Sequence, residues 1–366
     1  MKSVHILITG GHATPALSVA AAMRKAHADW KLSWIGRKQS LEGAKAISQE
    51  YRMVVKDNIP FYAITTGRLQ RTFSMYTIPS LLKIPIGFAQ ALFLLIKLQP
   101  TAVLTFGGYI GLPVGISAGL LGIPVFLHEQ TEKLGLANSI IAKFAKKIFL
   151  SWEKTRGIKK ENVIITGLPI RRNILFPPKY PSFTVPAKFP MLYVTGGSTG
   201  AESLNECVFP IIPRLVRYFT VIHQTGEPSY PKACALKDTL GNLKSRYIVA
   251  TFFDEDDVSW ILAKVTLVVA RSGANTVGEL MTVGKQAILV PLPWAGGGEQ
   301  EKNALMMARA GAAEVLEQEK ATPETLFIHI QERMKHPQEA HPMHFAEDPS
   351  DKIVSEIASF VSYHGR

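Results

Sequence analysis

Three short stretches combine glycine with hydroxyl or imidazole side chains where an apolar run ends: 9–12 (TGGH), 196–200 (GGSTG) and 271–276 (RSGANT). A chain that turns from a parallel strand into a helix uses glycine because it permits positive φ and close approach of a ligand to the backbone. The helix that follows presents unpaired N–H groups and a partial positive charge, which suit a phosphate. One such turn is weak evidence, but three in one chain predict a site for a phosphate or a sugar phosphate.

These turns do not match the best-known nucleotide motifs. No Gly-Lys-Ser/Thr follows any of them, so none is a Walker A loop. None is a complete G-x-G-x-x-G with an acidic residue about 20 positions later, so a dinucleotide-dependent dehydrogenase is not favoured.

Apolar runs that alternate with helical patterns extend through most of the chain. Continuous apolar runs are typical of buried parallel strands, and their alternation with helices predicts βαβ units. The expected strands are VHILI, KLSWIG, AVLTFG, IPVFLHE, KIFLS and VIITG in the first half, and MLYVTGG, TVIHQTG, YIVATFF, LVVARSG and AILVPL in the second. The fold class is therefore α/β, with two doubly wound domains that bind ligands beyond the carboxyl ends of their strands.

A proline-dense segment, 173–190, separates the two halves and can be neither a helix nor a central strand. We interpret it as the linker between an N-terminal domain, 1–172, and a C-terminal domain, 191–349. The last segment, 350–366, has apolar residues at helical spacing and is expected to be an amphipathic helix.

Composition limits the class of protein and its partners. The chain has 366 residues, 47% of them hydrophobic and 19% charged, which is enough apolar material for two cores. Its only cysteines, Cys207 and Cys234, lack metal-ligand spacing and suit a reducing compartment, and the N-terminal apolar run is too short for a signal peptide. The net charge of +12 favours anionic partners. Without a zinc-finger spacing, an RNP-like strand or an arginine-rich tail, nucleic acid is not an expected partner.

The residues at these turns lie within longer stretches that resemble one family, the lipid I N-acetylglucosaminyltransferases (MurG) of bacterial peptidoglycan synthesis. The matching stretches follow the family's order over nearly the whole chain: TGGHATPALSVA, LTFGGYIGLPVGISAGLLGIPVFLHEQTEKLGLANSIIAKFAKKI, TGLPIRRNI, VTGGSTGAESLN, HQTGE, ATFFDED, VVARSGANTVGELMTVGKQAILVPLP and EQEKNALMMARAGAA. The stretches around HEQ…GLAN and RSGANTVGE are the most specific.

The resemblance implies a GT-B fold, two Rossmann-like domains with the acceptor in the first and the donor nucleotide sugar mostly in the second. It also implies that the final helix packs back on the N-terminal domain. The implied reaction moves N-acetylglucosamine from UDP-N-acetylglucosamine to the 4-hydroxyl of the muramoyl sugar of lipid I, with inversion, giving lipid II. No cofactor and no metal are expected, and the implied location is the cytoplasmic face of the cell membrane.

On the donor side, the resemblance implies that Arg171 contacts the diphosphate, where a guanidinium fork suits phosphate oxygens. Ser198 is expected to donate to the same phosphates, Glu279 to bind the ribose hydroxyls, and the backbone of Phe253 to read the uracil edge. The full set of expected UDP-N-acetylglucosamine residues is Thr9, Gly10, Gly11, Thr131, Arg171, Ser198, Phe253, Ala274, Asn275, Thr276, Val277, Gly278, Glu279, Gln300 and Asn303.

On the acceptor side, His12 and Glu129 are the candidate catalytic groups. The ordinary pKa of a histidine, near neutrality, suits proton transfer, although His12 could equally cap the turn or bind an acceptor phosphate. His128 and Asn138 are further candidates for the acceptor site. Thr131 stands where family members often carry asparagine, and a hydroxyl keeps only part of the hydrogen bonds of an amide.

The segment 71–98 (RTFSMYTIPSLLKIPIGFAQALFLLIKL) carries the membrane prediction. Its apolar part is too short to span a bilayer, which needs about 20 residues. We expect 89–98 to be largely a buried core helix. The preceding part, rimmed by Arg68, Arg71 and Lys83, is expected to contact an anionic membrane surface, with Lys143, Lys146 and Lys147 adding to the patch.

Alternatives remain open from the sequence. Another GT-B glycolipid glycosyltransferase would keep the nucleotide residues and the membrane patch but change the acceptor groups. A catalytically silent membrane adaptor would not bind UDP, and a nucleotide-sugar epimerase would form no transfer product. The sequence leaves open the catalytic base, the acceptor peptide and the oligomeric state. It also leaves open whether the shortened first glycine loop and the glycine loop at 295–298 alter substrate contacts.

Overall fold

The structure is a computed structural model. It describes residues 3–39, 47–67, 77–131, 133–153, 155, 158, 161–186, 189–197, 201–293, 298–336, 342 and 347–364, with the backbone alone for 77–82 and 364. The chain divides into two compact units. The N-terminal unit comprises 1–170 together with 345–366, and the C-terminal unit comprises 171–344.

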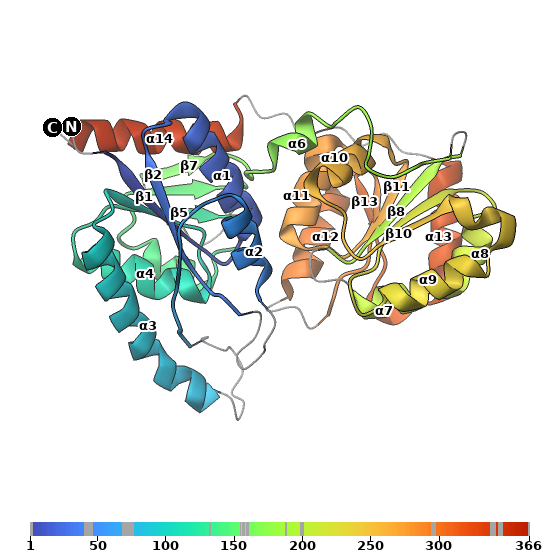
Figure 1. Cartoon of the computed structure of the whole chain (residues 1–366), viewed down its shortest axis with the longest axis horizontal. Helices are drawn as coiled ribbons and strands as arrows, with labels where there is room; N and C mark the ends of the chain where they lie inside the picture. Colours follow the sequence, from blue (N-terminus) through green and yellow to red (C-terminus); the bar gives the residue numbers. More distant parts are fainter. Residues whose placement is uncertain are drawn as a thin grey trace. The chain divides into compact units, whose positions relative to one another are not determined.

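The N-terminal unit contains a seven-stranded sheet in the order β3-β2-β1-β4-β5-β6-β7, in which every neighbouring pair is parallel (Figure 1). Its strands are β1 (His5–Thr9), β2 (Lys31–Gly36), β3 (Phe61–Ala63), β4 (Ala102–Thr105), β5 (Val125–Glu129), β6 (Lys147–Leu150) and β7 (Val163–Ile165). Its helices are α1 (Ala13–Ala26), α2 (Gln49–Lys56), α3 (Thr77–Leu98), α4 (Gly108–Leu120), α5 (Leu136–Ile141) and α14 (Pro349–His364).

Helices cover both faces of this sheet, so its strands are apolar on both sides. Along β1, Ile6 and Ile8 belong to the core shared with α1 and α14, whereas Leu7 belongs to the core shared with α3 and α4. This alternation is the period of two that a strand imposes on its side chains. It explains why the strands appear in the sequence as continuous apolar runs.

The final helix, α14, packs against α1 of the N-terminal unit (Figure 1). Ile353 and Ile357 are fully buried in the shared core, and Phe360 meets the Phe126 ring edge-on at 5.3 Å. Burying an isoleucine stabilises a fold by about 1.5–3 kcal/mol. This apolar face therefore fastens a segment distant in sequence to the first domain.

The C-terminal unit contains a six-stranded parallel sheet in the order β10-β9-β8-β11-β12-β13. Its strands are β8 (Met191–Thr195), β9 (Thr220–Gln224), β10 (Tyr247–Ala250), β11 (Leu267–Ala270), β12 (Ala287–Leu289) and β13 (Ala313–Val315). Its helices are α6 (Arg172–Leu175), α7 (Glu202–Val208), η1 (Phe209–Ile211), α8 (Ile212–Leu215), α9 (Tyr230–Asp238), η2 (Gly241–Arg246), α10 (Glu255–Lys264), α11 (Ala274–Val283), α12 (Glu299–Arg309), η4 (Gln318–Lys320) and α13 (Pro323–Lys335).

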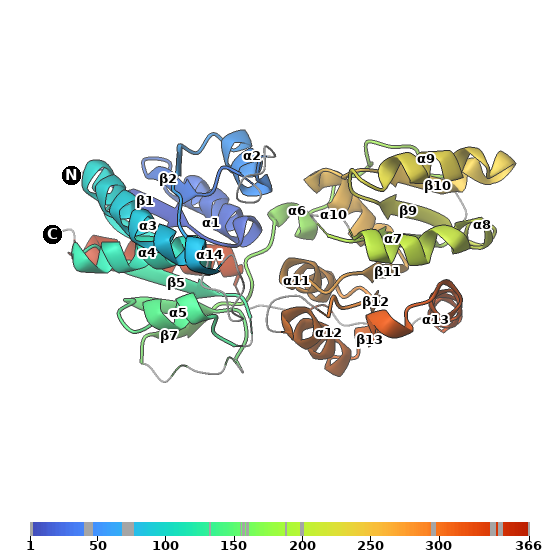
Figure 2. The same ribbon diagram turned by 90° about the horizontal axis from the view of Figure 1, so that it is seen from below.

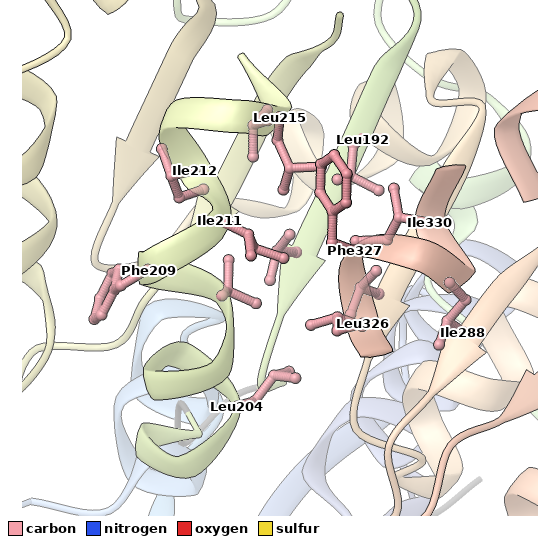
Figure 3. Close-up of a cluster of buried hydrophobic side chains, with 14 of the residues drawn as sticks. Leu192, Leu204, Phe209, Ile211, Ile212, Leu215, Ile288, Leu326, Phe327 and Ile330 are labelled. Atoms are coloured by element: carbon pink, nitrogen blue, oxygen red, sulfur yellow. The ribbon is translucent and has the colours of Figure 1, made fainter. Parts of the chain in front are cut away.

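Apolar side chains from η1, α8 and α13 close over one face of this sheet (Figure 3). Ile211, Ile212 and Leu215 meet Leu326, Phe327 and Ile330 above the strand that carries Leu192. Figure 2 shows that helices lie on both faces of this sheet, as they do in the N-terminal unit. The predicted fold class, α/β with two doubly wound Rossmann-like domains, is confirmed.

The proline-rich segment 173–190 lies in the C-terminal unit. Ser182 donates two hydrogen bonds to Asp257 of α10, from its backbone N at 2.7 Å and its Oγ at 2.5 Å. The Phe183 ring contacts the rings of Phe253 and Trp260. The segment therefore packs on α10 over part of its length.

No helix within the described residues is long and apolar enough to cross a membrane. The prediction that 89–98 is a buried helix holds for Ala91 and Leu95, which are at most 1% exposed. It is wrong for Phe93 and Ile96, which are 63% and 56% exposed. A helix that packs on one side of a sheet buries only the face it turns to the core.

Candidate functional site

Each sheet has one point where the strand order reverses, between β1 and β4 in the N-terminal unit and between β8 and β11 in the C-terminal unit. Ligands of doubly wound sheets bind beyond the carboxyl ends of the strands at such a point. All three glycine-containing turns follow strands that flank these two positions.

In the N-terminal unit, the turn after β1 lies against the turn after β4. The backbone N of Gly11 donates to the carbonyl of Gly107 at 3.0 Å, and Thr105 Oγ1 accepts from the backbone N of Gly107 at 3.1 Å. A Cβ at Gly10 would lie 2.7 Å from the Cβ of Phe106, so only glycine allows this approach. The turn after β1 therefore packs directly on the turn after β4 through Gly10 and Gly11. The Thr9 hydroxyl is buried without a hydrogen-bond partner in the described structure.

His12 precedes α1 and contacts the end of β5 through a residue that the sequence analysis did not select. Gln130 Nε2 lies 2.6 Å from His12 Nδ1, and the Gln130 side chain is buried. His12 keeps part of its surface exposed, but the protein around its ring lowers its pKa to about 4 by desolvation. The imidazole is therefore neutral at pH 7.

Glu129, the last residue of β5, is the centre of a hydrogen-bond network. Its Oε1 accepts from the backbone N and the hydroxyl of Thr131, at 3.0 and 2.8 Å. Its Oε2 accepts from Asn138 Nδ2 at 2.7 Å and from the backbone N of Gly135 at 3.2 Å. Glu129, Thr131 and Asn138 therefore form one hydrogen-bonded group that joins the end of β5 to Gly135 and the start of α5.

His128 lies inside the N-terminal unit. It is 1% exposed, and Ser151 Oγ lies 3.2 Å from its Nε2. Desolvation by burial lowers the pKa of His128 to about 3. Its ring centroid lies 5.0 Å from that of Phe106, so this neutral imidazole packs between the ends of β4 and β5.

In the C-terminal unit, the turn after β8 repeats the arrangement after β4. Gly197 has φ of +78°, and its backbone N donates to Thr195 Oγ1 at 3.0 Å. Gln224, at the end of β9, donates from Nε2 to the Gly197 carbonyl at 3.1 Å. Ser198, predicted to bind the phosphates, lies outside the described residues.

The turn after β11 leads into α11, which begins at Ala274 with Gly273 as its N-cap. The first-turn amides of Ala274, Asn275 and Thr276 have no intrahelical acceptor, as in any helix. Val277 and Gly278 are buried behind them. The Oδ1 atom of Asn275 is buried and lacks a partner within the described residues.

Arg171 and Glu279, expected to bind different parts of the donor, contact each other. Arg171 Nε and one terminal guanidinium nitrogen donate to the same Glu279 oxygen at 3.0 and 2.6 Å. The other terminal nitrogen lies 3.9 Å from Glu255 Oε1. Both carboxylates favour the charged guanidinium and raise the pKa of Arg171 against the effect of burial.

Backbone and amide groups expected to read the nucleotide and the sugar are partly engaged within the protein. The backbone N of Phe253 donates to Gln224 Oε1 at 3.1 Å, so this N–H, which was expected to read the uracil edge, is already engaged. Gln300 Oε1 accepts from the backbone N of Leu292 at 3.0 Å, and Asn303 Nδ2 donates to the Ser272 carbonyl at 3.1 Å. These bonds orient both amide side chains beside α11.

The structure therefore brings the predicted residues together in two groups, one in each unit. The N-terminal group is Thr9, Gly10, Gly11, His12, His128, Glu129, Thr131 and Asn138; the described C-terminal group is Arg171, Phe253, Ala274, Asn275, Thr276, Val277, Gly278, Glu279, Gln300 and Asn303. Sequence reasoning missed Gln130 and Gln224. Gln130 directly follows the selected Glu129, and Gln224 is the last residue of an expected strand; position at a strand end is the signal that would have identified both.

Comparisons with known proteins identify two successive domains of one family. Residues 9–150 match the glycosyltransferase family 28 N-terminal domain, and residues 191–358 match the glycosyltransferase family 28 C-terminal domain. The UDP-N-acetylglucosamine–N-acetylmuramyl-(pentapeptide) pyrophosphoryl-undecaprenol N-acetylglucosamine transferase of Treponema denticola is 33% identical, with 96% of this chain and 95% of that protein covered.

Among solved structures, the MurG of Acinetobacter baumannii superposes with a TM-score of 0.68 at 27% identity, covering 97% of this chain and 99% of that one. A UDP-N-acetylglucosamine 2-epimerase superposes with a TM-score of 0.63 at 14% identity, covering 100% and 98%, a likeness that shows the fold alone. The chain therefore belongs to the MurG family, within glycosyltransferase family 28, and has the GT-B fold predicted from its sequence.

Proposed function

We propose that this chain transfers N-acetylglucosamine from UDP-N-acetylglucosamine to the 4-hydroxyl of the muramoyl sugar of lipid I, giving lipid II for peptidoglycan synthesis. The observation that carries the proposal is the match of residues 9–150 and 191–358 to the two glycosyltransferase family 28 domains, together with a transferase 33% identical over 96% of the chain. The arrangement of side chains in each unit supports a division of labour between donor and acceptor.

The C-terminal unit is the proposed donor site. The first-turn amides of α11 and the guanidinium of Arg171 would bind the diphosphate, because both present N–H donors and positive charge. Glu279 would bind the ribose diol through Oε2, which has no partner within the described residues. The Phe253 carbonyl would accept from uracil, and Gln300 and Asn303 would bind the sugar hydroxyls.

Transfer with inversion is one displacement. The bond from the anomeric carbon to the acceptor O4 forms as the bond from that carbon to the β-phosphate oxygen breaks, and UDP leaves with the electron pair. The O4 proton leaves to a base. The amides of α11 and Arg171 would stabilise the charge that develops on the departing UDP, which is electrostatic catalysis by preorganised donors.

The N-terminal unit is the proposed acceptor site. Its turn after β1 places His12 at the carboxyl edge of the sheet, and Glu129 holds Thr131 and Asn138 through hydrogen bonds. A buried carboxylate whose two oxygens accept four hydrogen bonds fixes backbone and side chains together. We assign Glu129 the task of shaping the acceptor site through Thr131 and Asn138.

The exposed face of α3 is the proposed contact with the membrane that holds the lipid I tail, on its cytoplasmic side. Phe93 and Ile96 are exposed there, with the exposed Lys97 next to them. On neighbouring elements Leu120 is 78% exposed at the end of α4. Apolar side chains with nearby cations suit monotopic binding to anionic lipid. Lys147 contributes less than the sequence suggested, because it donates to Glu356 of α14 at 2.5 Å.

The test is incubation of the full chain with UDP-N-acetylglucosamine and a lipid I analogue, followed by mass analysis of the lipid product and of the nucleotide. The expected result is a disaccharide lipid and an equal amount of UDP, at a rate that a chelator leaves unchanged. An epimerised nucleotide sugar without lipid product would indicate an epimerase. A silent adaptor would bind neither UDP nor donor, and transfer to a diacylglycerol but not to the analogue would indicate a different glycolipid synthase.

A further inference from the structure

We propose that Gln130 holds His12 in the tautomer that carries its proton on Nε2, so that His12 acts as a hydrogen-bond donor to the acceptor substrate and not as the base. This inference rests on the proposed function, because the acceptor supplies the oxygen that His12 would bind. It assigns Gln130 as a positioning residue for the reaction.

The contact between the two side chains carries the argument. Gln130 Nε2 lies 2.6 Å from His12 Nδ1. An amide nitrogen donates and does not accept, so Nδ1 is the acceptor in this arrangement of the amide, in which Gln130 Oε1 is buried without a partner within the described residues. A neutral imidazole that accepts at Nδ1 carries its proton on Nε2. The nitrogen left for a substrate therefore has a proton to share and no lone pair to receive one.

Gln130 is held in place on two sides. It is 3% exposed, and its backbone carbonyl accepts from Trp152 Nε1 at 2.8 Å. It directly follows Glu129, whose carboxylate is anchored by Thr131 and Asn138. A side chain fixed by packing and by its neighbours keeps the geometry that a functional group needs.

The second ring nitrogen of His12, Nε2, can donate to an oxygen of a ligand. Nε2 has no hydrogen-bond partner within the described residues, and His12 keeps part of its surface exposed. The residue also directly precedes α1, where the backbone N–H groups of Ala13 and Thr14 lack intrahelical acceptors and Pro15 has no N–H. An Nε2–H beside such amides suits an anionic oxygen, such as one on the diphosphate of the acceptor.

The titratable groups around His12 support the donor role. Desolvation lowers the pKa of His12 to about 4, which makes it a weak base at pH 7. His128, whose charged form would repel a charged His12, is itself buried with its pKa lowered to about 3. Glu129 offers no free oxygen that would draw a proton onto His12, since both its oxygens accept from other groups.

The direct test is the nitrogen NMR spectrum of the full chain labelled at histidine, with the His12 signals identified by their loss in His12→Gln. The expected pattern is a protonated Nε2 and an unprotonated Nδ1 at pH 7. A protonated Nδ1 would mean that the Gln130 amide is turned the other way, and this result would overturn the proposal. The measurement does not depend on transfer, so it remains informative if the proposed function fails.

The kinetic test compares His12→Gln with His12→Ala. The glutamine amide can place an N–H donor near the position of Nε2 but has no basic nitrogen. If His12 is a donor, His12→Gln should retain at least about tenfold more kcat/KM for the acceptor than His12→Ala, the size expected for one hydrogen bond to an anion. Equal losses in the two variants would assign His12 as the base and contradict the inference.

A second pair of variants examines Gln130 itself. In Gln130→Glu the carboxylate only accepts, so it would move the imidazole proton to Nδ1 and raise the pKa of His12. We expect a loss of about tenfold or more in kcat/KM for the acceptor, with the KM for UDP-N-acetylglucosamine unchanged and a shifted pH profile. Gln130→Met, which removes the hydrogen bond without imposing the other tautomer, should lose less. A Gln130→Glu variant as active as the parent would overturn the proposal. Thermal unfolding of each full-length variant, compared with that of the parent, serves as the control for folding.

Discussion

Arg171 donates from two of its nitrogens to one oxygen of Glu279, at 3.0 and 2.6 Å, although 108 positions separate the two residues. Their side chains are 16% and 11% exposed, so the pair is largely withdrawn from water. Arg171 directly precedes α6, and Glu279 lies in α11. The pair thus orients a cation and a carboxylate beside the helix N-terminus that we propose as the diphosphate site.

Replacing Glu279 tests the donor site. In Glu279→Gln the ribose loses its charged acceptor and Arg171 loses its counterion. We expect the Kd for UDP to rise about tenfold or more, as for loss of a hydrogen bond to a charged group. The measurement is calorimetric titration of the full chain with UDP. Glu324→Gln is the matched control, because it breaks an exposed pair with Arg214 in the same unit and should leave the affinity unchanged. An unchanged Kd in Glu279→Gln would remove this residue from the donor site.

Gly107→Ala tests the packing of the acceptor-side turns. Gly107 has φ of +75°, and a Cβ there would collide with Asn138 Oδ1, whose amide holds Glu129. We expect a loss of about 2 kcal/mol or more in unfolding free energy and a lower kcat/KM for the acceptor. Thermal unfolding and initial rates measure the two effects.

Gly122→Ala is the control for that variant. Gly122 has a similar φ of +70°, but a Cβ there would meet nothing within 4 Å. Gly122→Ala should lower the unfolding free energy by only about 1 kcal/mol, the cost of placing alanine in the left-handed region. If Gly107→Ala and Gly122→Ala lose the same unfolding free energy and both keep the parent kcat/KM, the close contact between Gly107 and Asn138 does not contribute to stability or activity.

Glu50 gives the N-terminal unit a pH-dependent stability. Its carboxylate accepts from Trp34 Nε1 at 2.8 Å and from the backbone N of Arg37 at 3.2 Å, while burial raises its pKa from 4.5 to about 7. The Glu50 carboxyl loses its proton near pH 4.5 in the unfolded chain and near pH 7 in the folded chain. Stability from this group is therefore complete below pH 4.5 and is lost as the pH rises to 7, by about 3 kcal/mol at most.

Glu50→Gln removes that titration. We expect the slope of unfolding free energy against pH between 4.5 and 7 to become flatter than in the parent, because the amide carries no proton to lose. Urea unfolding at several pH values measures it. Glu356→Gln, at a partly exposed ion pair with Lys147 in the same unit, should keep the slope of the parent in this interval. A parent slope retained in Glu50→Gln would show that Glu50 ionises normally.

The membrane contact is tested on α3. Phe93→Ser combined with Ile96→Ser should reduce binding to vesicles that contain anionic lipid by about tenfold, because two exposed apolar side chains no longer enter the interface. Vesicle sedimentation measures it, and binding of the parent should fall with added salt. The control pair, Tyr218→Ser with Ile328→Ser, removes side chains that are 56% and 45% exposed in the C-terminal unit. Equal losses in both pairs would exclude α3 as a specific contact.

The elements of the fold were largely predictable, because their signals are local. All the expected strands occur, since strands buried on both faces are apolar throughout. The structure adds β3 and β13, three residues each, whose sequences FYA and AEV are too short to show a period. The apolar spacing of 350–366 predicted a helix, but only packing on α1 shows which core it completes.

Local features of the chain were enough to select the glycine turns after parallel strands and the histidine and glutamate at strand ends, because these follow from backbone geometry and side-chain type. Arg171 and Glu279 were selected through the resemblance to the family. The hydrogen-bond partners of these side chains are visible in the folded protein alone: Glu129 has both oxygens occupied, Arg171 is paired with Glu279, and His12 accepts from Gln130. A side chain has few donors and acceptors, and the neighbours that occupy them come from strands and helices far apart in the sequence.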